Sequence, residues 1–526
     1  MRAPHALSKY CHVSSRIQSA HRCSARHLAW LAFCVAVIGC TKQPPPPEAP
    51  TPPAREAFHA AKPLKAVVSS VAPEAEAEQS DWLQSEVSYL LRRGQMRIVD
   101  ESQASAPVFV LTIQIDSPNK QAVLKLVAPD QLTERERKLE LSTTTRLEIV
   151  TALARTLPTF LDASHASEDW STFIGTDDAR VYENYLRGAN ELLGSNAQGI
   201  TRASASRPRA RIVERLEVLA RNEPKFARAW AALAIGYLSL GGDDLRSLTD
   251  LAQSAAQRAL ALDDDLAAAH AALGMVDLRH NDWIAAHEKF EWALALDPNH
   301  PVALEGLTCL NADAGHHGKA LMRGIRAIAQ QPRNAGALEC LTFARLGSQS
   351  ARRPSEEETL PGSAARVRAL SGFLKGDRQV AERSLRSALS AREFEVWGAP
   401  LAKAAGNQRL VPDALKAITR AANDGYIDAA TEILCGAALR QPEFVFNRIS
   451  RLQREGMHAP LRILWLPDAD FLRSHSRFEE TISAAGLAGF WHGSGPPDIC
   501  DEEPNVYGCN LSGSDGQTKS TLISAP

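Results

Sequence analysis

The spacing of apolar residues between positions 64 and 162 alternates between the two-residue period of strands and the longer period of helices. Apolar runs that predict strands occur at LKAVVSSV, MRIV, PVFVLTIQI and AVLKLVA, and the last two flank DSPNKQ, a turn sequence typical of a hairpin. Helical stripes occur in SDWLQSEVSYLLRRG, which ends at a glycine, and in TTTRLEIVTALARTLPTFL, which begins at threonines suited to cap it. This order predicts a small α/β domain over residues 64–162.

Beyond residue 175 the apolar pattern is helical, and it repeats. The segments 267–300 and 301–334 follow each other directly and are equal in length. Small residues within them let two antiparallel helices approach closely, and a proline ends the second helix so that the chain can reverse. One such pair cannot bury its own apolar face, so neighbouring pairs must stack. The residues that recur at positions 7, 20, 27 and 32 are Leu273 and Leu307, Ala286 and Ala320, Ala293 and Ala327, and Pro298 and Pro332.

This spacing resembles the tetratricopeptide repeat, and the length of each segment is the one typical of that repeat. Residues 227–266 carry the same order of residue types, with about six additional residues in the turn. The resemblance implies a tetratricopeptide-type α-solenoid over residues 175–455, with 227–266, 267–300 and 301–334 as its clearest repeats. The expected fold class is therefore mainly α, with a solenoid preceded by the small α/β domain and a disordered proline-rich linker.

In tetratricopeptide folds the first helix of each repeat builds a concave wall, and the resemblance assigns the wall positions in this chain. Exposed apolar surface of this kind is typical of a groove that binds a helix or an extended peptide. The alternative is that the C-terminal segment or the α/β domain of the same chain fills the groove. A groove that clamps phosphate or carboxylate would need more arginine and lysine. The candidate groove residues are Ile235, Leu238, Met275, Leu278, Val302, Glu305, Glu339 and Phe343.

Residues 456–503 are expected to form a C-terminal cap, followed by a flexible tail at 504–526. Six apolar residues should form one cluster that closes the open end of the solenoid; they are Phe471, Phe478, Ile482, Leu487, Phe490 and Trp491. Together with VYENYLRGANELLG, this part resembles the sensory segments attached to bacterial winged-helix regulators and adenylate cyclases. No winged-helix or cyclase sequence accompanies it, so the output activity of those families is not carried over. The matching positions are Leu472, Arg473, Arg477, Phe478, Gly486, Leu487, Trp491, Pro497, Asp498 and Cys500.

The start of the chain has a basic segment followed by the apolar run LAWLAFCVAVIGC. This run is about 12 residues long, whereas a transmembrane helix needs roughly 20, and its order is typical of a secretory signal. The junction VIGC resembles the lipobox of bacterial lipoproteins, which implies a signal peptide at 1–39 and a lipid on Cys40. An uncleaved anchor is the alternative. The sequence PPPPEAPTPP within 40–63 predicts an extended tether.

The cysteines and histidines give weaker indications of chemistry. After Cys40 the chain has five cysteines, an odd number in a compartment that permits disulfides. Cys500 and Cys509 are a candidate disulfide in a short loop, whereas Cys309 and Cys340 are expected to be simply buried. The three histidines at predicted bends, His280, His316 and His317, could gather a metal, but solvated turn histidines are the commoner case. We therefore expect no metal and no cofactor.

The net charge and the motifs of the sequence limit the classes of function that we expect. With 59 basic and 61 acidic residues the chain has no basic excess that would favour nucleic acid. No nucleophile, acid pair or metal set occurs at a useful spacing, so an enzyme is not expected. The sequence favours a non-catalytic scaffold or sensor that binds a protein or peptide partner. We expect it to be a lipid-anchored lipoprotein of the bacterial cell envelope, either periplasmic or associated with the outer membrane. The alternative is a stand-alone sensory module that binds a small ligand and signals to a membrane regulator.

Overall fold

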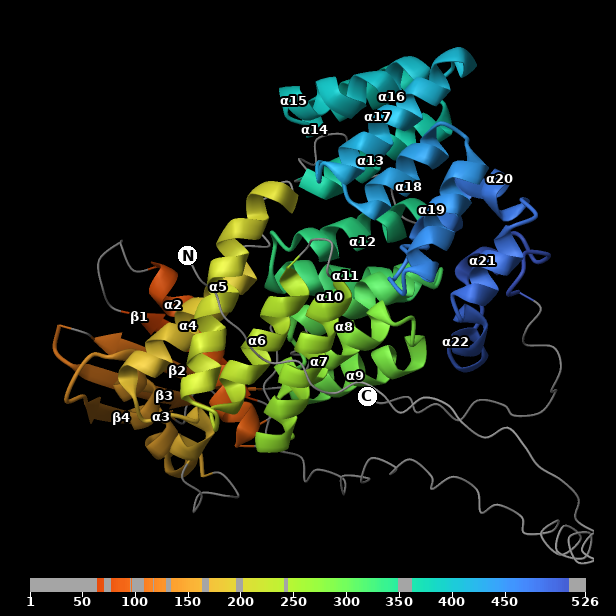
Figure 1. Cartoon of the computed structure of the whole chain (residues 1–526). Helices are drawn as coiled ribbons and strands as arrows, with labels where there is room; N and C mark the ends of the chain where they lie inside the picture. The colour runs from red at the N-terminus through yellow and green to blue at the C-terminus, as the bar shows by residue number, and fades with distance from the viewer. Residues whose placement is uncertain are drawn as a thin grey trace, which may run out of the picture. The chain divides into compact units, whose positions relative to one another are not determined.

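The computed structural model describes residues 64–70, 77–94, 96, 108–116, 118–128, 134–162, 170–194, 202–240, 245–348 and 362–509. Over these residues the chain is mainly helical, with a small sheet near its beginning (Figure 1). The expected signal peptide, Cys40, the proline-rich tether, most of the strand expected at MRIV and the tail after residue 509 lie outside the described residues.

Within the described residues, four strands form the sheet in chain order: β1 (Leu64–Ser70), β2 (Phe109–Asp116), β3 (Gln121–Val127) and β4 (Glu134–Glu140). β1 is parallel to β2, and the other neighbours are antiparallel. The apolar runs predict the first three strands but not β4, whose sequence ERERKLE has a single apolar residue. β4 is an edge strand that pairs with β3 through its backbone and exposes most of its charged side chains. Such charges discourage further pairing at the edge of a sheet.

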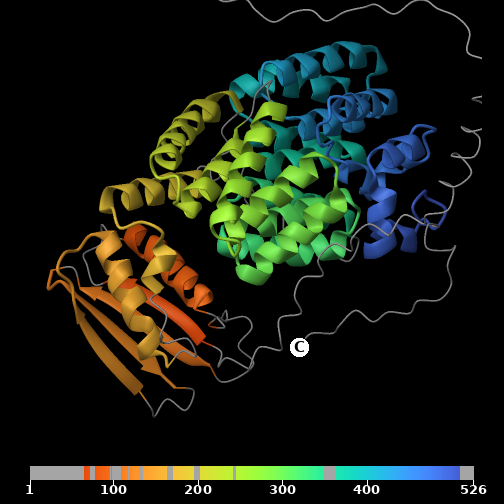
Figure 2. The same cartoon turned by 60° about the horizontal axis from the view of Figure 1, so that its bottom comes forward.

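Helices α2 (Ala77–Arg93) and α3 (Arg146–Phe160) cover one face of this sheet (Figure 2). Alternate residues of β2 point to that face and are buried, as a sheet with one solvated face requires. Thr145 caps α3 by accepting a hydrogen bond from the Glu148 amide at 3.3 Å. The hairpin and both helices predicted between residues 64 and 162 are therefore present.

The next part of the chain consists of helices. The 3-10 helix η3 (Trp170–Ile174) leads into α4 (Ala179–Gly194), α5 (Arg202–Asn222), α6 (Ala227–Ser239), α7 (Leu245–Leu262), α8 (Ala267–Arg279), α9 (Trp283–Leu296), α10 (Pro301–Asp313), α11 (His317–Gln330) and α12 (Ala335–Gly347). Helices α8, α10 and α12 begin at positions 267, 301 and 335, and α9 and α11 begin at 283 and 317, so the starts recur at the interval of the sequence repeat. The sequence period is thus a period of helix pairs. We call α6, α8, α10 and α12 the first helices, and α7, α9 and α11 the second helices.

Phe290 of α9 shows why this packing needs small residues on the first helices. Its ring is fully buried against Gly274 of α8 and Gly306 of α10. A β-carbon at Gly274 would come within 2.7 Å of the ring, and one at Gly306 within 2.3 Å. Both distances are shorter than the roughly 3.5–4.0 Å of a carbon–carbon contact. The two glycines therefore let one aromatic ring fill the space between three helices.

The remaining helices complete the described part of the chain. They are α13 (Gly362–Lys375), α14 (Arg378–Ala388), α15 (Ala391–Glu393), the π-helical turn η5 (Phe394–Gly398), α16 (Ala399–Ala404), η6 (Gln408–Leu410), α17 (Val411–Asn423), α18 (Ala429–Ala438) and α19 (Pro442–Arg454), followed by the short helices η7 (Arg462–Trp465), η8 (Pro467–Ala469), α20 (Asp470–Arg473), α21 (Phe478–Ala484), α22 (Leu487–Ser494) and η9 (Asp498–Asp501). We call residues 456–509 the C-terminal segment. Its helix η7 contacts α10, α12 and α18, and α22 contacts α9. The segment therefore packs along the repeated helices, and not only at their end. None of the described helices is long and apolar enough to cross a membrane.

Candidate functional site on the first helices

The eight candidate groove residues all lie on first helices, but they differ in exposure. Leu278 and Phe343 are 4% and 0% exposed and belong to the apolar core that also contains the C-terminal segment. These two are therefore closed to a partner, contrary to the prediction, because residues of the same chain cover them. The other six are half-buried: Ile235, Leu238, Met275, Val302, Glu305 and Glu339.

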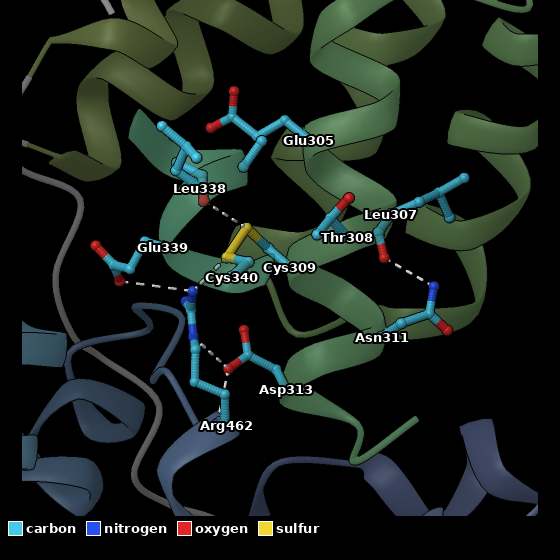
Figure 3. The surroundings of a disulfide bond; sticks show 12 residues. Glu305, Leu307, Thr308, Cys309, Asn311, Asp313, Leu338, Glu339, Cys340 and Arg462 are labelled. Carbon is cyan, nitrogen blue, oxygen red and sulfur yellow. Dashed lines mark hydrogen bonds and ion pairs between the residues drawn. A yellow bond between two sulfur atoms is a disulfide. The ribbon is translucent and has the colours of Figure 1, made fainter. Parts of the chain in front are cut away.

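Arg462 of η7 reaches across α10 and α12 (Figure 3). Its backbone amide and its Nε donate to Oδ1 of Asp313 at 2.9 and 3.0 Å. Its Nη1 lies 3.7 Å from Oε1 of Glu339, and its guanidinium lies 5.7 Å from the centre of the Phe343 ring. One arginine of the C-terminal segment thus occupies the part of the first helices where a partner was predicted to bind.

Asp313, at the end of α10, holds the C-terminal segment by further contacts. Nε2 of His458 lies 3.1 Å from its Oδ2, and Nε1 of Trp465 donates to its backbone carbonyl at 2.7 Å. Burial alone would raise the pKa of Asp313, but the Arg462 guanidinium and the hydrogen bond from His458 outweigh it and hold the pKa below its usual range. Asp313 is therefore an ionised anchor for the segment in the interior of the protein.

The two glutamates predicted on the wall have perturbed carboxyl groups. Burial raises the pKa of Glu339 to about 7, the negative charge of Asp428 adds to the rise, and Arg462 opposes it. Burial likewise raises the pKa of Glu305, which accepts a hydrogen bond from Nδ2 of Asn334 at 2.9 Å. These carboxyl groups are occupied within the chain, so they are not charges presented to a partner.

Two tryptophans fix the C-terminal segment to the turns between helices. Nε1 of Trp283, at the start of α9, donates to the carbonyl of Ala485 at 2.6 Å. Nε1 of Trp491 in α22 donates to the carbonyl of Ala314, just after α10, at 3.0 Å. All six apolar residues predicted for the C-terminal cap belong to this core or pack against it, Phe471 being half-buried. The cluster therefore forms, but it closes one edge of the helix pairs and not only their end.

The histidines at the bends are not solvated as a group. His316 and His317 are each 2% exposed, whereas His280 is exposed. Nε2 of His316 lies 2.8 Å from the carbonyl oxygen of Gly495, and Nε2 of His317 lies 3.3 Å from that of Trp465. The prediction of solvated turn histidines is wrong for this pair, because the C-terminal segment covers the turn on which they lie.

The start of α6 is covered by the α/β region. Nη1 and Nη2 of Arg228 donate to the Glu86 carboxylate of α2 at 2.9 and 2.5 Å, and Oη of Tyr182 donates to the same carboxylate at 2.6 Å. The Arg228 guanidinium also lies over the rings of Tyr89 and Tyr185, 4.3 and 4.9 Å from their centres. The C-terminal segment and the α/β region were the two parts of the chain expected as alternatives to fill the groove. Both cover part of the first helices: the C-terminal segment covers α10 and α12, and the α/β region covers the start of α6.

Two disulfides are present among the described residues. Cys500 and Cys509 are joined to each other, which is the pair that their spacing suggests. Cys309 of α10 and Cys340 of α12 are also joined, with their Cα atoms 5.0 Å apart, although the sequence favours simple burial. Their link follows from the repeat, because the two residues face each other across neighbouring first helices. Cys435 of α18 is a buried free thiol.

The most exposed large apolar residues of the repeats are not on the first helices. They lie on the second helices, and include Leu251 of α7, Ile284 of α9, and Met322 and Ile325 of α11, which are 45%, 51%, 68% and 59% exposed. Among the described residues of α6, α8, α10 and α12, no large apolar residue is exposed to this degree. The repeat pattern does not single out this second surface, although Met322 and Ile325 are spaced by about one helical turn and have an arginine between them.

No protein-family model matches the chain, and no curated protein is significantly similar to it. Across the described residues, no group of three or more histidine, cysteine or acidic side chains is arranged to hold a metal ion.

Proposed function

We propose that this chain is a non-catalytic protein-binding scaffold of the tetratricopeptide type, held at the bacterial cell envelope as a lipoprotein. Helix pairs whose starts recur at the interval of the sequence repeat support the repeat type, as does the ring of Phe290 seated between two glycines. The apolar run that ends at Cys40 supports the lipid anchor. The binding surface is the half-buried side of α6, α8 and the beginning of α10.

The observation that carries this proposal is a set of half-buried apolar side chains on three consecutive first helices. The set consists of Ile235 and Leu238 on α6, Met275 on α8 and Val302 on α10. An apolar surface that spans neighbouring helices suits the apolar face of a helix or of an extended peptide. We call these four residues the apolar set.

The C-terminal segment restricts binding to this part of the first helices. Leu461, Ile463, Leu464 and Trp465 are all 0% exposed. Exposing four such side chains would cost roughly 6–12 kcal/mol at about 1.5–3 kcal/mol each. This cost is comparable with the roughly 5–15 kcal/mol that stabilises a whole domain. A partner that competed for the α10–α12 surface would have to offset this cost, so we expect the segment to stay in place.

Single substitutions in the apolar set test the proposal. We would replace Met275 or Ile235 by Asp in the tagged full-length chain, and recover crosslinked partners from bacterial envelopes. Each substitution should reduce partner recovery at least about tenfold, because a buried unpaired carboxylate costs more than about 1.4 kcal/mol at an interface. Helix content measured by circular dichroism should not change.

Ile325→Asp on α11 is the matched control, because Ile325 is apolar and exposed but lies on a second helix. It should leave recovery unchanged. Loss of the partner with Ile325→Asp but not with Met275→Asp would overturn the proposed surface. Phe343 is unsuitable for this test, since its burial means that a charge there would disturb folding.

Two further measurements separate the parts of the proposal. A small metabolite that raises the melting temperature of the purified chain without a partner would favour the ligand-binding sensory module instead. Cys40→Ala should move the protein into the soluble fraction and abolish labelling by a fatty-acid analogue. If the variant remains bound to membranes, the lipoprotein anchor is wrong, and the scaffold proposal must be judged on the capture experiment alone.

A further inference from the structure

We propose that the disulfide between Cys309 and Cys340 is a thiol–disulfide exchange site, at which an external thiol attacks Cys309 and Cys340 departs beside Arg462. The two sulfur atoms have different surroundings. Cys309 is half-buried on α10, whereas Cys340 is 1% exposed within α12. This difference in exposure favours attack at Cys309 over attack at Cys340.

Access to Cys309 follows from its place in the repeat. Cys309 and Met275 occupy equivalent positions on consecutive first helices, since each is the ninth residue of its repeat. The Cys309 sulfur lies 3.8 Å from the carbonyl oxygen of Gly336 on α12, and the Glu305 carboxylate lies over the α-carbon of that glycine. Cys309 therefore holds on α10 the repeat position that Met275 of the apolar set holds on α8.

Arg462 makes Cys340 the better leaving group. Nη1 of Arg462 donates to the Cys340 sulfur (Figure 3). A guanidinium beside a sulfur favours the thiolate, and a thiol of lower pKa leaves faster in disulfide exchange. Arg462 remains charged, because its own pKa is high and the carboxylates of Asp313 and Glu339 face it. The contact that anchors the C-terminal segment thus also polarises the disulfide.

The chemistry consists of two exchange steps. A thiolate forms a bond to the Cys309 sulfur, the bond between the two cysteines breaks, and its electron pair stays on Cys340 as a thiolate. A second thiolate then attacks the external sulfur of the mixed disulfide and releases Cys309 as a thiolate. Two external thiols are oxidised to one disulfide, and the Cys309–Cys340 disulfide is reduced to a dithiol. The reductant is therefore a thiol compound or a protein dithiol.

The first test determines which sulfur is attacked. The oxidised full-length protein would be mixed with glutathione and quenched with acid at early times, and free thiols would be alkylated before peptide mapping. Glutathione should be found on Cys309 and the alkyl label on Cys340, with this arrangement at least about tenfold more abundant than the reverse. Equal amounts, or glutathione mainly on Cys340, would overturn the proposal. A brief pulse of one alkylating reagent before the quench labels buried Cys435 only in molecules that have unfolded, and a second reagent of different mass, added in denaturant after the quench, labels every remaining thiol.

The second test concerns Arg462 and distinguishes chemistry from folding. Arg462→Gln should slow the reduction of Cys309–Cys340 by roughly threefold to tenfold, because the leaving thiolate loses its guanidinium. Arg462→Lys should keep most of the rate, and the Cys500–Cys509 disulfide of the same molecule should be reduced at an unchanged rate. A merely structural role predicts the opposite, since a loosened protein would be reduced faster and would expose Cys435. Unchanged or faster reduction in molecules whose Cys435 is not labelled by the first reagent would refute the role of Arg462.

Discussion

Glu339 should make the folded chain less stable as the pH rises towards neutrality, and Glu339→Gln should remove this dependence. The Glu339 side chain is only 13% exposed, and its pKa is raised from 4.5 to about 7, chiefly by burial. Because the pKa is higher in the folded chain than in the unfolded one, the folded chain holds an additional proton between these two values. The free energy of unfolding must therefore fall as the pH rises from 4.5 to about 7.

The magnitude follows from the size of this shift. The difference between about 7 and 4.5 is about 2.5 pKa units. At about 1.36 kcal/mol for each unit, ionised Glu339 costs about 3 kcal/mol of folding stability at a pH above both values. Glutamine has nearly the same shape and carries no charge, so it can fill the same space without this cost. Arg462 at 3.7 Å is the nearest compensating charge, and its effect is already contained in the shift.

Urea unfolding followed by circular dichroism would measure the effect in the wild-type chain and in Glu339→Gln, at about pH 5 and about pH 8. The variant should be about 3 kcal/mol more stable than the wild type at the higher pH, and close to it at the lower pH. The buried His316 and His317 have lowered pKa values, so they also reduce the free energy of unfolding as the pH falls through about 6.5. This reduction is the same in both proteins, so it does not affect the difference between them. The exposed Glu479→Gln is the control, and should show the same difference from wild type at both pH values. A difference between wild type and Glu339→Gln that does not change with pH would refute the reasoning.

Three other substitutions test the packing. Replacing both Cys309 and Cys340 by Ser should lower the free energy of unfolding by about 3–4 kcal/mol in non-reducing thermal melts. The reason is that a disulfide between residues 31 apart no longer constrains the unfolded chain. A loss of stability that persists when both proteins are reduced would point to lost packing instead. Phe290→Ala should cost about 3–5 kcal/mol in urea unfolding, since it leaves a cavity between three helices, and a cost below about 1 kcal/mol would mean that the helices close the gap. Glu86→Ala should cost about 3–5 kcal/mol by leaving the Arg228 guanidinium buried and unpaired, and the double variant Glu86→Leu with Arg228→Met should recover most of this loss. A double variant no more stable than Glu86→Ala would contradict this explanation.

The elements that the sequence predicts correctly are those with a local signal. The period of the sequence repeat reappears in the starts of α8, α10 and α12, because the spacing of apolar and small residues determines which side of each helix is buried. The hairpin of β2 and β3 is predictable for the same reason. β4 has almost no apolar residue, and it forms because the neighbouring strand offers its backbone hydrogen bonds. No periodic pattern marks a strand of that kind.

The contacts of the candidate site could not be predicted from local patterns, because they join residues far apart in the chain. Arg462 binds Asp313 across 149 residues, and Arg228 binds Glu86 across 142. One signal was nevertheless available in the sequence. A carboxylate such as Glu339 within an otherwise apolar helix face needs a partner of opposite charge or becomes protonated, since burying an unpaired charge is costly. The charged positions on the predicted wall therefore indicated a surface that other parts of the same chain cover.

The partner that we propose should contact the wall through apolar side chains. The charged residues at the two ends of the wall are satisfied within the chain, Arg228 by Glu86 and Asp313 by Arg462. Between them the apolar set offers side chains such as Met275, and no ionised group of that set is available to pair with a charge on the partner. A charged segment bound there would lose the hydration of its charges without compensation, whereas an apolar helix face has no charge to desolvate. Binding by the apolar set should therefore select partners by apolar shape, and its affinity should depend little on salt concentration.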